Sequence, residues 1–271
     1  MKNTKTALVT GASGGLGLEF ARLLAADGYR VVLVARNETA LQAAPAEMQS
    51  LYGVEASYYA TDLSKPDNVE ALLQKLKTDN LSIDCLVNNA GFGDAGYFLD
   101  KPFELHHEMM MLNMHALTRL THTLAQEMKA KGHGYILNLA STAAFQPAPA
   151  FAVYAATKSY VLSFSEGLRY ELRNTGVSVT VSCPGPTETP FHDRAATRTS
   201  KIMQMGMMKP EVVAAQAFRA MKARKRRVVH GWLNKLLVMS GAITPRALLI
   251  KATHDLMKPK KSINYIKIQF N

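Results

Sequence analysis

Short apolar runs alternate with longer segments of helical pattern along most of this chain of 271 residues, and the connections are too long for hairpins. Continuous apolar runs are typical of parallel strands buried on both faces. The alternation therefore predicts an α/β fold, a doubly wound parallel sheet between two layers of helices in a single domain. The predicted strands are 6–10, 29–35, 54–61, 84–89, 135–140, 178–183 and a final 228–230. The first predicted helix starts at Leu16, and the others cover 38–52, 64–76, 105–131 and 152–174.

Four segments rich in glycine or polar residues directly follow predicted strands. They are the glycine-rich turn 11–17, the loop 88–91, Ser141 and the pair Pro184-Gly185. The carboxyl ends of parallel strands meet at one edge of the sheet, and ligands bind at this edge. The sequence therefore predicts a single site where these four segments come together.

Composition limits the classes of protein to consider. With 48% hydrophobic residues the chain can bury a substantial core, and its two cysteines lie in separate apolar runs, which indicates reduced thiols rather than a disulfide. The first residues lack the apolar segment of a signal peptide, and no run of eighteen apolar residues could span a membrane. We therefore expect a cytoplasmic protein.

The turn TGASGGLG at 10–17 has a G-x-x-x-G-x-G spacing between a predicted strand and a predicted helix. Glycines in such a turn let the backbone approach a pyrophosphate, which then lies at the positive end of the helix. The spacing differs from the common fingerprint G-x-G-x-x-G, and the alternative is a plain tight turn. Its place between strand and helix favours a nucleotide site.

The end of the second predicted strand bears on which nicotinamide cofactor the site would take. A free ribose 2′-hydroxyl is held by an acidic residue about twenty residues past the glycines, and a 2′-phosphate by an Arg. The chain has Arg36 at this place and no carboxylate before Glu38. Arg36 therefore favours NADP, with the Ser13 hydroxyl on the same phosphate. The alternative is a solvated Arg at the start of a helix.

Tyr154 and Lys158 lie four residues apart in a predicted helix and so share one face. The pKa of a Tyr is ordinarily about 10, and a nearby cation lowers it toward the range that suits a general acid at neutral pH. The Ser141 hydroxyl, aimed at the same place, would polarise a carbonyl oxygen. The alternative is a Tyr that packs in the core and a solvated Lys. As a unit, the three residues suit proton transfer that accompanies hydride transfer.

Jointly these motifs resemble those of the short-chain dehydrogenase/reductase family, in the branch of chains of about this length. The resemblance covers about residues 5–230, and its motifs stand in the family's order: TGASGGLG, Asp62, NNAG at 88–91, Asn113, Ser141, YAATK at 154–158 and PGPTET at 184–189. It implies a Rossmann-type fold and an oxidoreductase that uses NADP(H). Members are often dimers or tetramers, so we expect a homo-oligomer.

The resemblance also implies catalytic roles. Tyr154 would donate a proton to the substrate carbonyl in reduction, or accept one in oxidation. Lys158 would lower the pKa of Tyr154 and bond the nicotinamide ribose, while Ser141 would position the substrate oxygen. Asn113 would hold a water that links Lys158 to solvent, although an Asn also suits a polar helix face. No metal is expected in the site.

Around the cofactor, the resemblance implies contacts from the adenine end to the nicotinamide. The Asp62 carboxylate would contact the adenine, although an Asp here also suits a turn at the end of a strand. Asn88 is expected to brace the sheet, and Thr187 departs from the Val or Ile that is common at its position. The expected cofactor residues are Gly11, Ser13, Gly15, Leu16, Gly17, Arg36, Asp62, Leu63, Asn89, Ala90, Gly91, Tyr154, Lys158, Pro184, Gly185, Thr187 and Thr189.

The last quarter of the chain carries the whole positive charge. Residues 201–271 contain 15 Lys and Arg against 2 acidic residues, whereas 1–200 contain 17 against 19. We expect a catalytic domain at 1–231 and a basic amphipathic extension at 232–271. The extension suits an anionic membrane surface or an acidic carrier protein, and equally the solvated face of a helix packed on the domain. Nucleic acid is not expected, because no aromatic platform or known motif accompanies the charge.

Residues 190–209 are expected to form a lid over the substrate. Four methionines cluster there, at 203, 205, 207 and 208, and thioethers adapt to irregular apolar ligands. An apolar carbonyl substrate, such as a 3-oxoacyl or steroid-like compound, would suit such a lid, and so would a Met-rich helix packed on the core. The leading hypothesis is an NADPH-dependent carbonyl reductase or alcohol dehydrogenase. The alternative is a non-catalytic scaffold that binds NADP or a membrane surface.

Overall fold

The computed structural model describes residues 4–191, 195 and 206–257. Within them seven parallel strands form one sheet in the order β3-β2-β1-β4-β5-β6-β7. The strand order reverses direction between β1 and β4, which is where ligands of open α/β sheets bind. The strands are β1 (Thr6–Thr10), β2 (Arg30–Ala35), β3 (Ala56–Ala60), β4 (Ile83–Asn88), β5 (Gly134–Leu139), β6 (Val177–Cys183) and β7 (Arg227–Val229).

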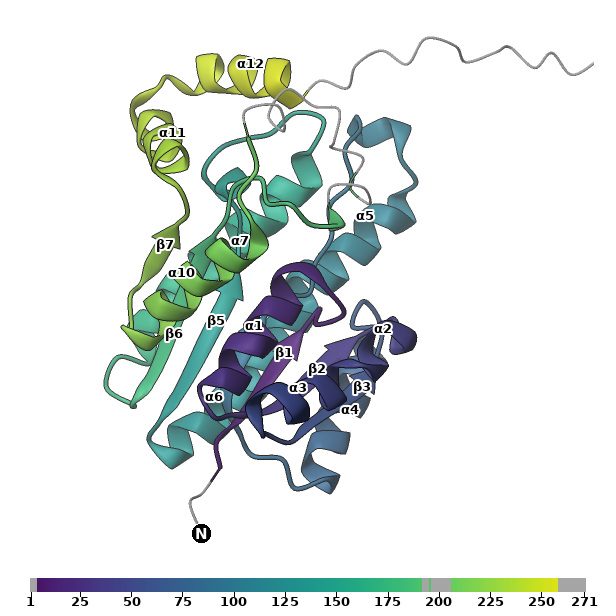
Figure 1. Ribbon diagram of the computed structural model, residues 1–271. Coiled ribbons are helices and arrows are strands. Elements are labelled where there is room, and N and C mark those ends of the chain that lie inside the picture. The colour runs from purple at the N-terminus through teal and green to yellow at the C-terminus, as the bar shows by residue number, and fades with distance from the viewer. Residues whose placement is uncertain (1–3, 192–194, 196–205, 258–271) are drawn as a thin grey trace, which may run out of the picture.

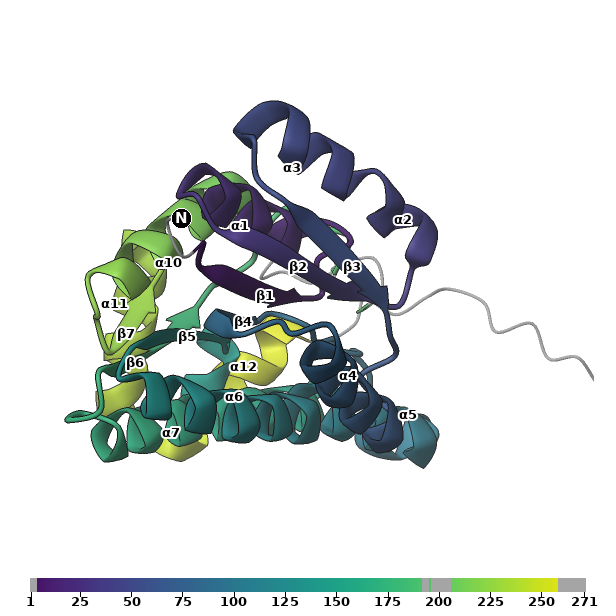
Figure 2. The ribbon, with the colours of Figure 1, turned by 90° about the horizontal axis from the view of Figure 1, so that it is seen from below.

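Helices cover both faces of the sheet (Figures 1 and 2). Helices α1, α2, α3 and α10 lie on one face and α4, α5, α6 and α7 on the other (Figure 2). The predicted three-layer, doubly wound fold is confirmed. The helices are α1 (Gly15–Ala26), α2 (Glu38–Gln42), α3 (Ala44–Tyr52), α4 (Pro66–Thr78), α5 (Phe103–Met110), α6 (Leu117–Lys131), α7 (Ala152–Glu171), α10 (Pro210–Lys222), α11 (Trp232–Ile243) and α12 (Arg246–Met257), with short helical turns η1 (Phe98–Asp100), η2 (Met111–Ala116) and η3 (Thr142–Phe145).

Two helices that the sequence predicts as continuous are interrupted. The segment 38–52 breaks at Ala43, and Pro45 lies in the first turn of α3, where its missing N–H leaves no helical bond unmade. The segment 105–131 contains a π-helical turn, η2, between α5 and α6. A π-helical turn is wider than an α-helical turn because it contains an extra residue. Helical periodicity in the sequence indicates which face of a helix is apolar but does not reveal such an insertion.

The start of α4 also differs from the prediction at Ser64. The helix begins at Pro66, and its N-cap residue Lys65 makes no side-chain capping bond. The Ser64 hydroxyl instead donates to the Asp62 carboxylate at 2.8 Å, within the turn that follows β3. The end of α6 at Gly132 is as predicted, because Gly132 takes the left-handed conformation that closes a helix.

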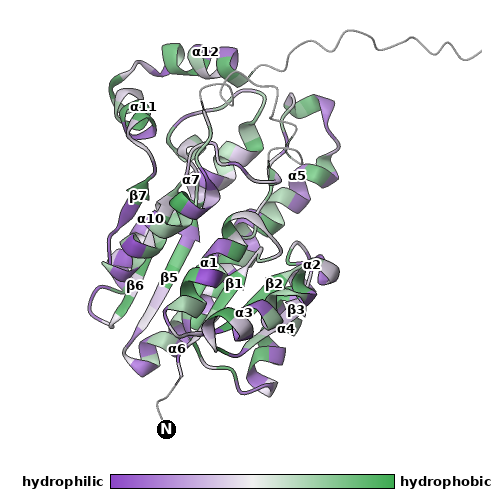
Figure 3. Cartoon of the chain, in the orientation of Figure 1, coloured by the Kyte–Doolittle hydropathy of each residue, from purple (hydrophilic) through white to green (hydrophobic). Residues whose placement is uncertain are grey.

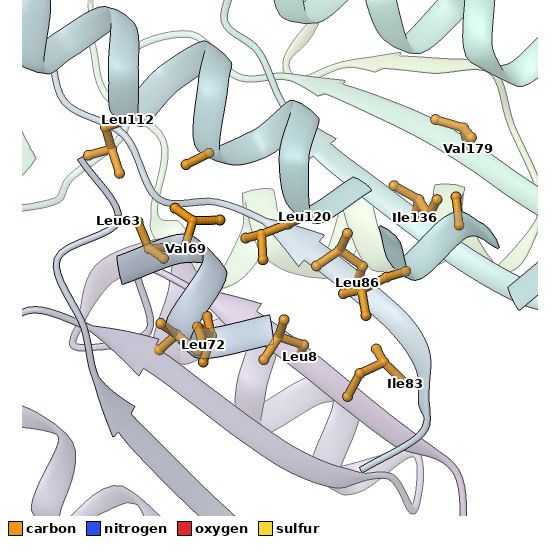
Figure 4. Close-up of a cluster of buried hydrophobic side chains, with 14 of the residues drawn as sticks. Leu8, Leu63, Val69, Leu72, Ile83, Leu86, Leu112, Leu120, Ile136 and Val179 are labelled. Atoms are coloured by element: carbon orange, nitrogen blue, oxygen red, sulfur yellow. The ribbon is translucent and has the colours of Figure 1, made fainter. Parts of the chain in front are cut away.

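Alternate residues of each central strand pack into opposite cores. Leu8, Leu86 and Ile136 contribute to the core beneath α4 and α6, which is shown in Figure 4, while their strand neighbours pack under α1 and α3 on the other face. Full burial of one such side chain contributes about 1.5–3 kcal/mol to stability. Cys85 and Cys183 are buried and free, as predicted.

Candidate active site

A cavity of about 510 Å³ opens at the carboxyl edge of the sheet. The glycine-rich turn after β1, the ends of β2, β4, β5 and β6, and helix α7 all contribute to its wall. The four segments that the sequence places at this edge therefore lie around one cavity. Most of the predicted site residues line it: Gly11, Ser13, Gly15, Leu16, Arg36, Leu63, Asn89, Ala90, Gly91, Ser141, Tyr154, Lys158, Pro184, Gly185, Thr187 and Thr189.

Three predicted site residues are not part of the cavity wall. The Asp62 carboxylate accepts hydrogen bonds from the backbone N–H and the hydroxyl of Ser64. Gly17 and Asn113 lie behind the wall, where each makes close contacts that shape it. Their predicted contacts with a cofactor or a water stay predictions.

The glycine turn is shaped by close backbone contacts. Gly11 has φ +67°, and a Cβ added there would lie 2.8 Å from Asn89 Nδ2 and 2.9 Å from Ala90 Cα. A Cβ on Gly17 would overlap the carbonyl oxygen of Gly11. These two glycines let the first turn of α1 approach the end of β4. Gly15 and Leu16 at the start of α1 line the cavity, and the positive end of a helix suits an anion.

Hydrogen bonds from the end of β4 hold this turn in place. Asn89 Nδ2 donates to the carbonyl oxygens of Thr10 and Gly11, at 3.0 and 3.2 Å. In return the Thr10 hydroxyl accepts from the backbone N–H groups of Asn89 and Ala90, both at 3.0 Å. Asn88 braces the sheet, as predicted, because its Nδ2 donates to Thr121 of α6 and to Asn138 of β5, both at 2.9 Å.

We expect Gly17→Ala to destabilise the protein by about 1–3 kcal/mol, because the added methyl group forces α1 away from the turn. Thermal unfolding measures this effect. Gly167→Ala in α7 is the matched control, since a Cβ at Gly167 meets no atom within 4 Å. A Gly17→Ala variant as stable as the wild type would show that the turn relaxes without strain.

Tyr154 lines the cavity and is 7% exposed. Its ring packs between those of Phe151 and Phe191, with centroids 4.3 and 5.6 Å away. Burial raises the pKa of Tyr154 to about 12, and a hydrogen bond with the Ser141 side chain opposes part of this rise. The pKa is thus higher than the sequence predicted, because desolvation outweighs the stabilisation of the phenolate.

Lys158 is 5% exposed, one turn along α7 from Tyr154. Its Nζ lies 5.7 Å from the centre of the Tyr154 ring and donates to the carbonyl oxygen of Leu139 at 2.8 Å. Burial lowers the pKa of Lys158 to about 8. Burial thus brings the pKa of this ammonium group toward the range that suits proton transfer at neutral pH.

Asn113 lies in the π-helical turn η2 and fastens two parts of the site together. Its Oδ1 accepts from the backbone N–H of Phe92 at 3.1 Å, and its Nδ2 donates to the Phe92 carbonyl oxygen at 2.9 Å and to the Thr157 hydroxyl at 3.0 Å. The Thr157 hydroxyl in turn donates to the carbonyl oxygen of Tyr154 at 2.8 Å. The widened turn thus holds the loop after β4 against the helix that carries Tyr154.

Arg36 also lines the cavity and keeps 44% of its side chain exposed. Its Nη1 lies 3.2 Å from Glu108 Oε1. Ion pairs of this exposure contribute about 0–1 kcal/mol, so a stronger anion such as a phosphate could compete with Glu108 for the guanidinium.

The sequence did not predict the part of the wall that helix α12 supplies. Thr253, Leu256 and Met257 line the cavity, about a hundred residues after Tyr154. Met257 is 6% exposed and belongs to the same core cluster as Phe151 and Tyr154. The signal in the sequence was the helical spacing of these residues, but periodicity does not say which surface an apolar face will cover.

Comparison with known proteins decides the family. The model of the short chain dehydrogenase family matches residues 5–200. The chain belongs to this family. Short-chain dehydrogenases are oxidoreductases that use a nicotinamide cofactor, and the resemblance drawn from the motifs is confirmed.

Two curated relatives and one solved structure illustrate the match. The chain is 36% identical over 175 residues to a very-long-chain 3-oxoacyl-CoA reductase of Laccaria bicolor, which covers 64% of this chain but only 52% of that protein. It is 35% identical over 225 residues to a putative ketoacyl reductase of Streptomyces coelicolor, covering 82% and 83% of the two chains. A short-chain dehydrogenase from Sphingobium yanoikuyae in complex with NADPH has a TM-score of 0.79 and 31% identity, covering 88% and 93%.

The cavity of this short-chain dehydrogenase fits a nicotinamide dinucleotide. Its wall includes a glycine turn in which an added Cβ at Gly11 would meet the backbone of Ala90, the cation of Arg36, and the side chains of Tyr154 and Lys158. One continuous cavity is therefore lined by the glycine turn, by Arg36 and by Tyr154 with Lys158. Among the described residues, no cluster of three or more His, Cys, Asp or Glu side chains could hold a metal ion.

Proposed function

We propose that this short-chain dehydrogenase is an NADPH-dependent carbonyl reductase, reversible as an alcohol dehydrogenase, that acts on apolar ketones or aldehydes. The observation that carries the proposal is the single cavity that Ser141, Tyr154 and Lys158 line together with the glycine turn and Arg36. The names of the relatives, which include ketoacyl and 3-oxoacyl-CoA reductases, support a 3-oxoacyl or similar carbonyl.

In this proposal the cofactor lies along the edge of the sheet. Its pyrophosphate meets the start of α1 at Gly15 and Leu16, and its 2′-phosphate meets Arg36 and Ser13. Its remaining contacts are those expected from the sequence: Asp62 and Leu63 at the adenine, Asn89, Ala90 and Gly91 at the ribose, and Pro184, Gly185, Thr187 and Thr189 at the nicotinamide. When bound, the nicotinamide supplies the hydride.

The side chains of the protein then orient the substrate and transfer the proton. The Ser141 hydroxyl, which lowers the pKa of Tyr154, orients the carbonyl oxygen of the substrate toward the phenol. Tyr154 Oη donates its proton to that oxygen as negative charge develops on it. Lys158, with its pKa near 8, restores the proton to Tyr154. Asn113 holds the loop and the helix that carry this relay at a constant distance.

The substrate side of the cavity favours an apolar compound. The rings of Phe151 and Phe191 flank Tyr154, and Leu256 and Met257 of α12 close the wall. The proposed lid 190–209 lies mostly outside the described residues, including Met203 and Met205. A homo-oligomer, a substrate delivered by an acidic carrier and a cytoplasmic location are also proposals.

A screen of NADPH oxidation over ketones, aldehydes, 3-oxoacyl thioesters and steroids tests the proposed function. We expect oxidation with apolar carbonyl compounds and a kcat/KM that rises with the apolar surface of the substrate. Tight NADPH binding without turnover of any class would instead support the alternative, a non-catalytic protein that binds NADP. The presence of Ser141, Tyr154 and Lys158 in one cavity favours the enzyme.

Arg36→Ser is expected to lower the ratio of kcat/KM for NADPH to that for NADH by about 10- to 100-fold, because a hydrogen bond to a charged group contributes about 1.5–3 kcal/mol. Initial rates with each cofactor measure the ratio. Arg30→Ser is the matched control, because Arg30 also pairs with a glutamate but lies at the amino end of β2. An unchanged ratio in Arg36→Ser would rule out the 2′-phosphate contact.

A further inference from the structure

Helices α11 and α12, joined by a short turn at Thr244 and Pro245, expose an apolar outer surface; we call the two helices the hairpin and this surface the hairpin face. Figure 1 shows the hairpin beside the carboxyl edge of the sheet, and Figure 3 shows hydrophobic residues along both helices. No residue of α11 is buried. The exposed large apolar side chains of the hairpin face are Trp232, Leu233, Leu236, Leu237, Met239, Ile243, Leu248 and Ile250.

The hairpin packs on the domain through its other side. In α11, Asn234 donates to the carbonyl oxygen of His230 and lies against Gly185 of the cavity wall. In α12, Thr253 and Met257 are buried, and His254 Nε2 lies 3.0 Å from the Tyr97 hydroxyl. These contacts leave the hairpin face largely open to solvent, with Trp232 74% and Ile243 86% exposed. A group of exposed large apolar side chains of this kind marks an interaction site.

Cations accompany the apolar side chains. Lys235, Arg246 and Lys251 are exposed on the two helices, whose single acidic residue is Asp255. The sequence that follows α12, residues 258–271, adds four more lysines and no acidic residue. The hairpin and the sequence after it thus combine apolar and positive groups, the composition of a segment that lies on an anionic surface.

The length and charge of the hairpin distinguish between the surfaces it could meet. Each helix has 12 residues, and no described helix is long and apolar enough to cross a membrane. A second copy of the chain, placed symmetrically, would bring the cations of both hairpins together around one Asp255 from each. An anionic lipid surface satisfies both groups at once, since it accepts apolar side chains at the acyl boundary and attracts the lysines.

We propose that the hairpin face docks this protein on the surface of an anionic lipid bilayer. The apolar side chains of α11 and the first turns of α12 enter the boundary between headgroups and acyl chains. Lys235, Arg246 and Lys251 remain at the level of the lipid phosphates, where long side chains keep their charge in water.

Docking would also place the cavity next to the bilayer. Helix α12 has the hairpin face on its outer side and cavity wall on its inner side, through Thr253, Leu256 and Met257. This consequence rests on the proposed function, because it gives an apolar carbonyl compound dissolved in the bilayer a short path to Tyr154. The docking itself does not depend on any activity.

The fluorescence of Trp232 tests the docking directly. Trp232 is the sole tryptophan of the chain and is 74% exposed. We expect its emission to move to shorter wavelength when the full chain meets vesicles of phosphatidylcholine mixed with phosphatidylglycerol. The shift should be smaller with phosphatidylcholine alone and should weaken in high salt, which screens the charge. No shift with the anionic vesicles would overturn the proposal.

Flotation of variants with the same vesicles tests the surface. We expect Leu236→Ser/Ile243→Ser to lower the floated fraction at least about tenfold, because it removes two inserted apolar side chains. Leu51→Ser is the matched control, since Leu51 is 65% exposed in α3, far from the hairpin in the chain. Equal loss in both variants would contradict the proposal. So would a double variant that floats like the wild type but changes its mass in light scattering, because the hairpin face would then bind a second copy.

Discussion

Tyr154→Phe is expected to lower kcat about 10²- to 10⁴-fold, the contribution of a positioned general acid. The substitution removes the hydroxyl and keeps the ring that packs against Phe151 and Phe191. NADPH affinity should therefore stay within about threefold of the wild type, or about 0.6 kcal/mol. Steady-state rates on the best substrate of the screen, with a fluorescence titration of NADPH, measure the two quantities.

Tyr160→Phe is the matched control for this prediction. Tyr160 lies on the same helix, and its hydroxyl also takes part in a hydrogen bond, 2.8 Å from Thr118 Oγ1, but it does not line the cavity. The control should keep nearly full activity. If Tyr154→Phe kept its activity as well, the proton donor would have to be another group, and the proposed mechanism would be wrong.

Lys158→Met is expected to lower kcat about 10²-fold or more while making the folded protein more stable. Burial lowers the pKa of Lys158 from 10.5 to about 8, and each pKa unit corresponds to about 1.4 kcal/mol of unfavourable free energy for the buried charge. The variant also loses the hydrogen bond from Lys158 to Leu139, which lowers its free energy of unfolding by about 1 kcal/mol. A net gain of about 2 kcal/mol at pH 7 raises Tm by about 4–8 °C in a chain of this size.

The pH dependence of this gain follows from the lowered pKa of Lys158. Below pH 8 the side chain is protonated in both the folded and the unfolded wild type. The full unfavourable free energy of the buried charge therefore destabilises the folded state. Between pH 8 and pH 10.5 the folded state gives up its proton first, and the stability of the wild type rises relative to the variant. The difference in Tm should therefore shrink as the pH rises through this range.

Thermal unfolding at pH 7 and pH 10 checks both the gain and its pH dependence. Lys77→Met is the control, because Lys77 is exposed at the end of α4 and its substitution should change stability little at either pH. A Lys158→Met variant that is less stable than the wild type at pH 7 would show that the ammonium group is not an unfavourable buried charge.

Most of the fold could be predicted from local pattern. The β-branched run at β2 and its counterparts at β4 and β6 indicate strands buried on both faces, and the structure confirms all of them. Even the short β7 lies within one residue of its predicted position. These predictions succeed because the period of apolar residues and the length of a connection are properties of the chain itself.

The local pattern failed where distant parts of the chain set the geometry. The π-helical turn at Asn113 exists together with hydrogen bonds to Phe92 and Thr157, which are 21 and 44 residues away. The pKa of Tyr154 was predicted in the wrong direction, because spacing along a helix gives the distance to Lys158 but not the burial of the phenol. Desolvation depends on everything packed around a group, and no sequence window contains that.

The site divides in the same way. The sequence by itself determined the parallel sheet, its carboxyl edge and the residues that meet there, because chemistry-bearing residues follow strands whose direction the chain connections dictate. Only the tertiary structure decided that α12 closes the cavity with Thr253, Leu256 and Met257 while α11 leaves its apolar face open. The reason is physical: an amphipathic period says that a helix has an apolar side, whereas the partner of that side depends on which surface the rest of the fold leaves uncovered.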